Sequence, residues 1–145
     1  MRWEDEDEIK KDRLFRDYDT VLKESAVLTT FGGVLFGFLL NISIRGENHL
    51  SYLERIILVL ALFSITIAVS LFVMPVIYHH IQFPYTEVDK FKKRAHRFIL
   101  FGLIPTAVTL YLGMILAFSP LLDNLAYFVA GLPFVFVYIL YRMRK

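Results

Sequence analysis

The stretch IILVLALFSITIAVSLFVMPVIY, residues 56–78, decides the fold of this chain. It contains fifteen Ile, Leu, Val and Phe residues and no charged residue. Each of those residues favours membrane insertion by roughly 0.3–0.6 kcal/mol, whereas one central Asp or Arg would cost roughly 2.5–3.5 kcal/mol. As an α-helix rising ~1.5 Å per residue, the stretch is long enough to cross a hydrocarbon core of ~30 Å. We therefore predict that it is a transmembrane helix.

Three further runs, residues 26–44, 98–122 and 124–141, also lack charged residues. Asp, Glu, Lys and Arg make up 21% of the chain, and nearly all of them lie between the runs or at the two ends. A soluble helical bundle is the alternative, but its helices would have no polar face to turn towards water. The pattern therefore favours an all-α, polytopic membrane protein.

The predicted organisation has two parts. Residues 1–25 form a cytoplasmic acidic arm and amphipathic helix, and residues 26–145 form a four-helix transmembrane domain. The spans are predicted at about 26–44, 56–78, 98–118 and 124–141. Ser119-Pro120 followed by Asp123-Asn124 supplies turn residues for a tight hairpin between the third and fourth spans.

The distribution of Lys and Arg predicts the orientation. Six of these residues lie in the N-terminal segment, five in the loop 79–97 and three in the C-terminal tail, whereas the connection after the first span has only Arg45 and Arg55. Positive charge favours the cytoplasmic side, so both termini and the loop 79–97 are predicted to be cytoplasmic.

The N-terminal segment changes character along its length. It opens with the acidic block Glu4–Glu8 and continues with apolar or small residues at helical spacing. An amphipathic helix could lie on the membrane or continue directly into the first span, and the sequence leaves both open. The basic residues of the second connection are predicted to contact anionic lipid headgroups or a cytoplasmic protein; they are Lys90, Lys92, Lys93, Arg94 and Arg97.

Three histidines, His79, His80 and His96, fall at the predicted inner ends of the second and third spans. Together with Glu87 and Asp89 they could hold a divalent metal or respond to pH. Their spacing fits no known ligand pattern, and adjacent histidines on a helix point in different directions. Interfacial histidines beside lipid headgroups are the simpler interpretation.

The first span carries small or polar residues at every fourth position: Ser25, Thr29, Gly33, Gly37 and Asn41. The GxxxG element within this series allows two helix backbones to approach closely. One interpretation is a packing face against a helix of the same or a neighbouring subunit. The other is that several first helices surround an axis and line a pore.

Three prolines, Pro75, Pro105 and Pro133, lie inside predicted spans and are expected to kink them. Each removes one helix hydrogen bond and so frees a carbonyl, those of Leu71, Phe101 and Val129. A neighbouring hydroxyl is the usual partner for such a carbonyl, and a passing cation is the rarer one.

The spans contain no ionisable residue. Proton- and sodium-coupled transporters usually place Asp, Glu, His or Lys near the midplane, so coupled transport is disfavoured. The chain has no Cys, no phosphate-binding loop and no nucleophile paired with a base. We therefore expect neither an enzyme nor a cofactor, and no nucleic-acid partner.

The chain resembles a family of small, uncharacterised four-helix membrane proteins of bacteria and archaea, a domain of unknown function whose members are sometimes labelled sodium:proton antiporters. The resemblance covers roughly residues 20–141 and rests on three motifs. These are Lys23-Glu24 running into GGVLFGFLL at 32–40, MPVIYHH at 74–80, and KRAHR at 93–97. The resemblance implies the fold and a location in the plasma membrane of a prokaryote. The antiporter label conflicts with the lack of a midplane carboxylate.

A fainter similarity, in layout, is to the Orai calcium channels, which have a glycine-bearing first helix around the pore. Gly33, Pro75 and His96-Arg97 occupy comparable places here. The chain departs from that layout at the outer end of its first span, where Asn41 stands instead of a glutamate. Calcium selectivity of that type is therefore not implied.

Together these patterns predict a homo-oligomeric, ion-channel-like conduit for a small cation, lined by the first span and surrounded by membrane lipid. The alternative is a non-transporting membrane scaffold or a subunit that binds lipid or a cytoplasmic partner. A cation:proton antiporter ranks third.

Overall fold

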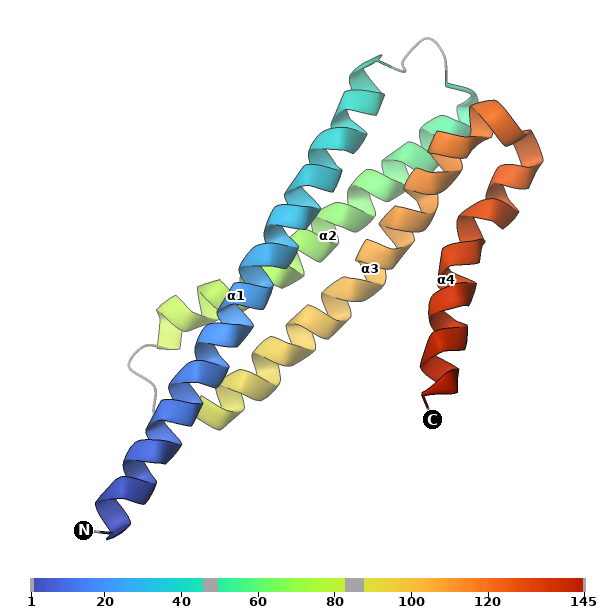
Figure 1. The fold of residues 1–145 in the computed structure, drawn as a ribbon. Helices are drawn as coiled ribbons and strands as arrows, with labels where there is room; N and C mark the ends of the chain where they lie inside the picture. The colour runs from blue at the N-terminus through green and yellow to red at the C-terminus, as the bar shows by residue number, and fades with distance from the viewer. Residues whose placement is uncertain (1, 46–49, 83–87, 145) are drawn as a thin grey trace.

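The computed structural model describes residues 2–45, 50–82 and 88–144, and within them every side chain except those of 2–11, 13–15, 17–18, 82 and 88–90. The predicted all-α class is confirmed. The elements are α1 (Arg2–Arg45), α2 (Tyr52–Gln82), α3 (Val88–Leu122), the short 3-10 helix η1 (Asp123–Leu125) and α4 (Ala126–Met143). Figure 1 shows that successive α-helices run in opposite directions, so α1 and α3 point the same way.

Three helical segments of the described chain are long and apolar enough to cross a membrane. They are Asp19–Arg45, Tyr52–Ile81 and Phe91–Met143. The third segment has 53 residues and contains both α3 and α4, because helical backbone continues through η1. The predicted count of four spans is therefore not confirmed: by length and composition the described residues hold three candidates.

The N-terminal arm and the first span form one continuous helix, α1, of 44 residues. Of the two predicted arrangements, the structure has the direct continuation. Val21, at the end of the arm, is buried in a small cluster with Phe91, Ala95 and Ile99 of α3. The arm is thus anchored by packing against the start of α3.

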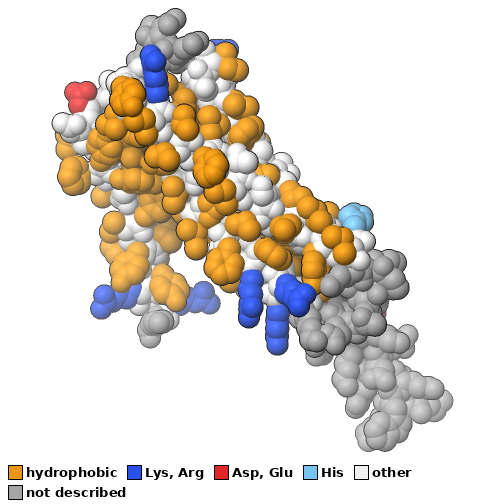
Figure 2. Space-filling model, turned by 180° about the vertical axis from the view of Figure 1, so that it is seen from behind, with side chains coloured by type: hydrophobic (Ala, Val, Ile, Leu, Met, Phe, Trp, Pro, Cys, Tyr) orange, Lys and Arg blue, Asp and Glu red, His pale blue; other side chains and the backbone are white. Residues whose placement is uncertain are grey.

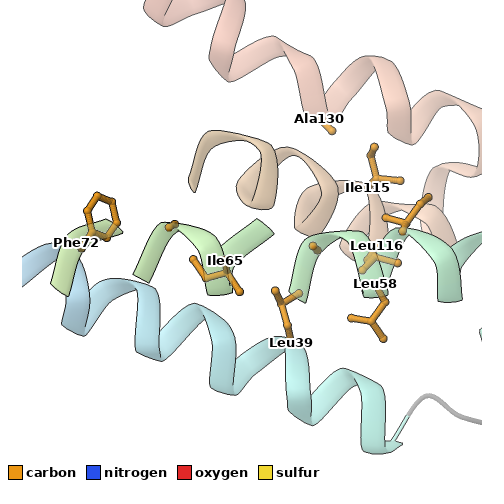
Figure 3. Close-up of a cluster of buried hydrophobic side chains, with 10 residues drawn as sticks. Leu39, Leu58, Ile65, Phe72, Ile115, Leu116 and Ala130 are labelled. Atoms are coloured by element: carbon orange, nitrogen blue, oxygen red, sulfur yellow. The ribbon is translucent and has the colours of Figure 1, made fainter. Parts of the chain in front are cut away.

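A main core cluster joins all four α-helices around α2. Figure 3 shows Leu39 of α1, Leu58, Ile65 and Phe72 of α2, Ile115 and Leu116 of α3, and Ala130 of α4. The α1 residues that face this core and the cluster at the start of α3 alternate spacings of four and three, as in a left-handed coiled coil. They are Val21, Ser25, Leu28, Gly32, Leu35, Leu39 and Ile42; Phe36, next to Leu35, packs against the main core in addition.

Two glycines allow α2 to approach its neighbours closely. A Cβ atom at Gly32 of α1 would lie 2.6 Å from Val69 Cγ2, and one at Gly102 of α3 would lie 2.5 Å from Phe72 Cε1. Both distances are shorter than van der Waals contact permits. A side chain at either position would therefore displace α2 or repack its residues.

The reversal between α3 and α4 lies later than predicted. Pro120 remains inside α3, and the chain turns at Asp123, whose φ is 44°. Asp tolerates this left-handed conformation because its short polar side chain can hydrogen-bond locally. The predicted turn at Asp123-Asn124 is thus correct, whereas Ser119-Pro120 belongs to the last turn of the helix.

α4 is the peripheral helix. Among the described residues it contacts only α3 and η1, and its buried residues are Ala126 and Ala130. In Figure 1 its C-terminal half diverges from the other helices. Its remaining surface is largely exposed and apolar, so α4 adds little to the core that holds α1, α2 and α3 together.

Candidate functional site

The polar series on α1 does not form one face of the folded chain. Ser25 is fully buried, Thr29 is half-buried, and Gly33, Gly37 and Asn41 are exposed. A step of four residues advances about 40° around a helix of 3.6 residues per turn. The series therefore winds away from α2 as it runs along α1, and its outer half is turned away from the core.

The buried end of this series is a tie between helices. The Ser25 hydroxyl donates to the backbone carbonyl of Phe72, one turn before Pro75. A second tie joins α2 to α3, where the Ser64 hydroxyl donates to the carbonyl of Pro105 at 2.9 Å. A hydroxyl was predicted to donate to the carbonyl that each proline frees, those of Leu71 and Phe101 for Pro75 and Pro105. The two hydroxyls instead donate to nearby carbonyls, those of Phe72 and Pro105.

The outer half of the series remains uncovered. A Cβ atom at Gly33 or Gly37 would meet nothing within 4 Å. Val34 and Phe38 are also exposed on this side, at 66% and 61%. The close approach predicted for the GxxxG element is therefore not made among the described residues, where Gly32 is the glycine of α1 that approaches α2 closely. We call Gly33, Gly37 and Asn41 the outer face of α1.

The histidines do not come together. The rings of His79 and His80 lie 5.2 Å apart at an interplanar angle of 56°, whereas His96 lies on α3 against α1. Within the described ranges, no three His, Asp or Glu side chains gather into a group that could hold a metal ion. Glu87 and the side chain of Asp89 lie outside the described residues.

Figure 2 shows a broad hydrophobic surface with most of the visible Lys and Arg side chains along its lower edge and fewer at its upper end. At the start of α3, Lys92, Lys93, Arg94 and Arg97 are all exposed; the side chain of Lys90 lies outside the described residues. Arg94 donates to the Tyr78 hydroxyl, and its guanidinium lies 5.6 Å from the centre of the Tyr78 ring. Tyr78 in turn stacks on Phe91, with ring centres 5.8 Å apart.

The opposite end holds a polar contact that sequence reasoning missed. Ser51 and Glu54 form a capping box at the start of α2: the Ser51 amide donates to the Glu54 carboxylate at 2.8 Å, and the Glu54 amide donates to the Ser51 hydroxyl at 3.3 Å. The Ser119 hydroxyl of α3 donates to the same carboxylate at 2.7 Å. The spacing Ser51-x-x-Glu54 could have revealed the cap, but nothing in the sequence indicates Ser119.

Comparison with known proteins gives one match. A family model described as a family of unknown function (DUF6328) matches residues 7–144, and the chain belongs to this family. No curated protein and no solved structure matches the chain. The predicted resemblance to an uncharacterised family is therefore confirmed in that general form. The antiporter label and the Orai layout remain predictions.

Proposed function

We propose that this member of a family of unknown function is an integral protein of a prokaryotic plasma membrane that crosses the membrane four times, α3 and α4 each crossing once. Both termini are cytoplasmic. Support comes from exposed large apolar side chains on every helix, since soluble monomers rarely expose large continuous apolar surfaces. The larger number of basic side chains at one end of this surface supports the orientation.

Copies of the chain assemble through α1 into a channel-like conduit for a small cation. The observation that carries this proposal is the uncovered outer face of α1, where Gly33 and Gly37 have open space and Asn41 is exposed. Small residues let helices of neighbouring copies approach, and an amide exposed at membrane depth needs a polar partner or water.

A path around an axis of several copies fits the packing better than a path within one copy. Ala61, Ile65, Ala68 and Phe72 are completely buried along the centre of the bundle. Protein interiors packed in this way leave few voids larger than a water molecule. Polar groups available for conduction therefore have to come from outward faces brought together by assembly.

Ion flux into liposomes that contain the purified protein tests the conduit. Gly37→Leu fills the outer face of α1, so it is expected to alter or abolish flux while leaving the single chain folded. Gly113→Leu is the matched control, because Gly113 also has open space around it but lies on α3. Equal effects of the two substitutions, or no flux of any common cation through the unmodified protein, would contradict the conduit.

The alternative function is a non-transporting scaffold or lipid-binding subunit. The exposed Lys92, Lys93, Arg94 and Arg97 favour it, since clustered basic residues beside a membrane attract anionic lipid or an acidic partner. Normal assembly without flux would support this alternative. Antiport ranks third, because residues 26–44, 56–78, 98–122 and 124–141 contain no ionisable side chain for a midplane relay.

A further inference from the structure

Residues of α1 and α3 line an open cleft of about 620 Å³. Each helix contributes one stripe of residues at spacings of three and four. Lys23, Glu24 and Val27 belong to the α1 stripe, and His96, Leu100 and Leu103 belong to the α3 stripe. The volume falls within the range of roughly 300–1,000 Å³ that is typical of ligand sites.

The surface that lines the cleft is almost entirely apolar, and its polar residues lie at one end. Because α1 and α3 run in the same direction, both stripes start with polar residues and continue with apolar ones. The apolar part is accessible: Val27 is 68% exposed, Leu100 50% and Leu103 41%. In the proposed orientation the polar end faces the cytoplasm and the apolar end lies in the membrane. A phospholipid has the same polarity from headgroup to acyl chain.

The charges at the polar end define which headgroup fits. Lys23 and Glu24 present opposite charges side by side, with His96 on the facing helix. Lys23 pairs with Asp19 at 2.6 Å, but both side chains are exposed, and an ammonium group has two further donors. Lys23 and His96 can hold a phosphate, whereas Glu24 would repel it unless a cation accompanies it.

We propose that this cleft binds a zwitterionic phospholipid with a phosphoethanolamine headgroup from the cytoplasmic leaflet. Lys23 and His96 contact the phosphate, Glu24 pairs with the primary ammonium group, and one acyl chain lies along Val27, Leu100 and Leu103. An anionic lipid that lacks the ammonium group would leave Glu24 unpaired beside the phosphate. The proposal rests on the membrane location and orientation proposed above, but not on conduction.

Lipid retention measures this selectivity directly. The full-length protein is equilibrated in detergent with equal amounts of phosphatidylethanolamine and phosphatidylglycerol, and native mass spectrometry counts the lipids bound to each copy. We expect phosphatidylethanolamine to be preferred. Glu24→Lys should lower the ratio of bound phosphatidylethanolamine to phosphatidylglycerol roughly two- to fivefold, the size expected for one partly exposed ion pair.

Two variants complete the test. Asp12→Lys makes the same charge change on α1 at an exposed position away from the cleft, so it should leave the ratio unchanged. Leu103→Trp narrows the apolar end and should lower retention of both lipids. Equal binding of the two lipids, a preference for phosphatidylglycerol, or equal effects of Glu24→Lys and Asp12→Lys would overturn the proposal. Because binding is counted without flux, a failure here is distinct from a failure of the conduit.

Discussion

Gly32 and Gly33 are neighbours on α1, yet they belong to faces with different surroundings. Gly32 lies on the inner face, where a Cβ atom would be 2.6 Å from Val69 Cγ2, whereas a Cβ atom at Gly33 would meet nothing within 4 Å. The residues of the inner face of α1 are separated by alternating steps of four and three positions. Those of the outer face, Gly33, Gly37 and Asn41, are each four positions apart. The difference teaches that a small residue in a long apolar helix need not mark a contact within the chain: Gly32 makes one, whereas Gly33 is available for the assembly that we propose.

The largest effect is expected at Gly102, a buried glycine of α3 that faces an aromatic ring of α2. In Gly102→Ala the new methyl group would lie 2.5 Å from Cε1 of the buried Phe72 ring, and overpacking of this kind costs about 1–3 kcal/mol. Gly113→Ala is the control, since its added methyl group meets nothing and helix propensity improves by up to ~1 kcal/mol. Thermal unfolding in detergent, followed by circular dichroism, should separate the two; equal midpoints would remove the distinction between the faces.

A smaller effect is expected on α1 itself. Gly32→Ala conflicts with the Val69 side chain, which is half-buried and has more freedom to adjust than a buried ring. We expect a loss of about 1 kcal/mol in the free energy of unfolding, at the low end of the overpacking range. Gly33→Ala should instead leave unfolding of the single chain unchanged or slightly stabilised, and should change assembly, measured by the mass of the detergent-solubilised complex. Destabilisation of the single chain by Gly33→Ala would show that its face is not free.

The smallest effect is expected for two hydroxyl side chains of α1, the buried Ser25 and the exposed Thr30. Ser25→Ala removes the buried hydrogen bond to the Phe72 carbonyl and should lower the free energy of unfolding by about 0.5–1.5 kcal/mol. Thr30→Ala removes an exposed bond to the Ala26 carbonyl of the same helix, so unfolding should change little. If both variants unfold alike, the tie between α1 and α2 contributes nothing measurable.

Much of the fold could be predicted because charge and helical length are local properties. The helical class, the extents of the apolar runs and the turn at Asp123 all follow from residues close together in the chain. The candidate site was harder to predict from the sequence. The series Ser25 to Asn41 was recognised, but whether its members face inward depends on where α2 lies, which spacing along α1 alone does not specify.

Some features of the structure could not be predicted from any one segment of the sequence. The contact of Ser119 with Glu54 joins residues 65 positions apart, and the cleft at Lys23 and His96 needs two helices that meet only in the fold. Gly102 could be recognised as small, but not as the residue opposite Phe72. Each depends on the register between helices, which side-chain packing over the whole interface sets.

The sequence by itself determined that this chain forms long apolar helices with its positive charge concentrated on one side, because transfer of side chains from water to hydrocarbon is nearly additive along a chain. The tertiary structure alone decided which glycines are covered, which hydroxyls tie two helices together, and that the outer face of α1 is not covered by the described residues. Those outcomes depend on the rotation of each helix about its axis, and packing between neighbouring helices fixes that rotation.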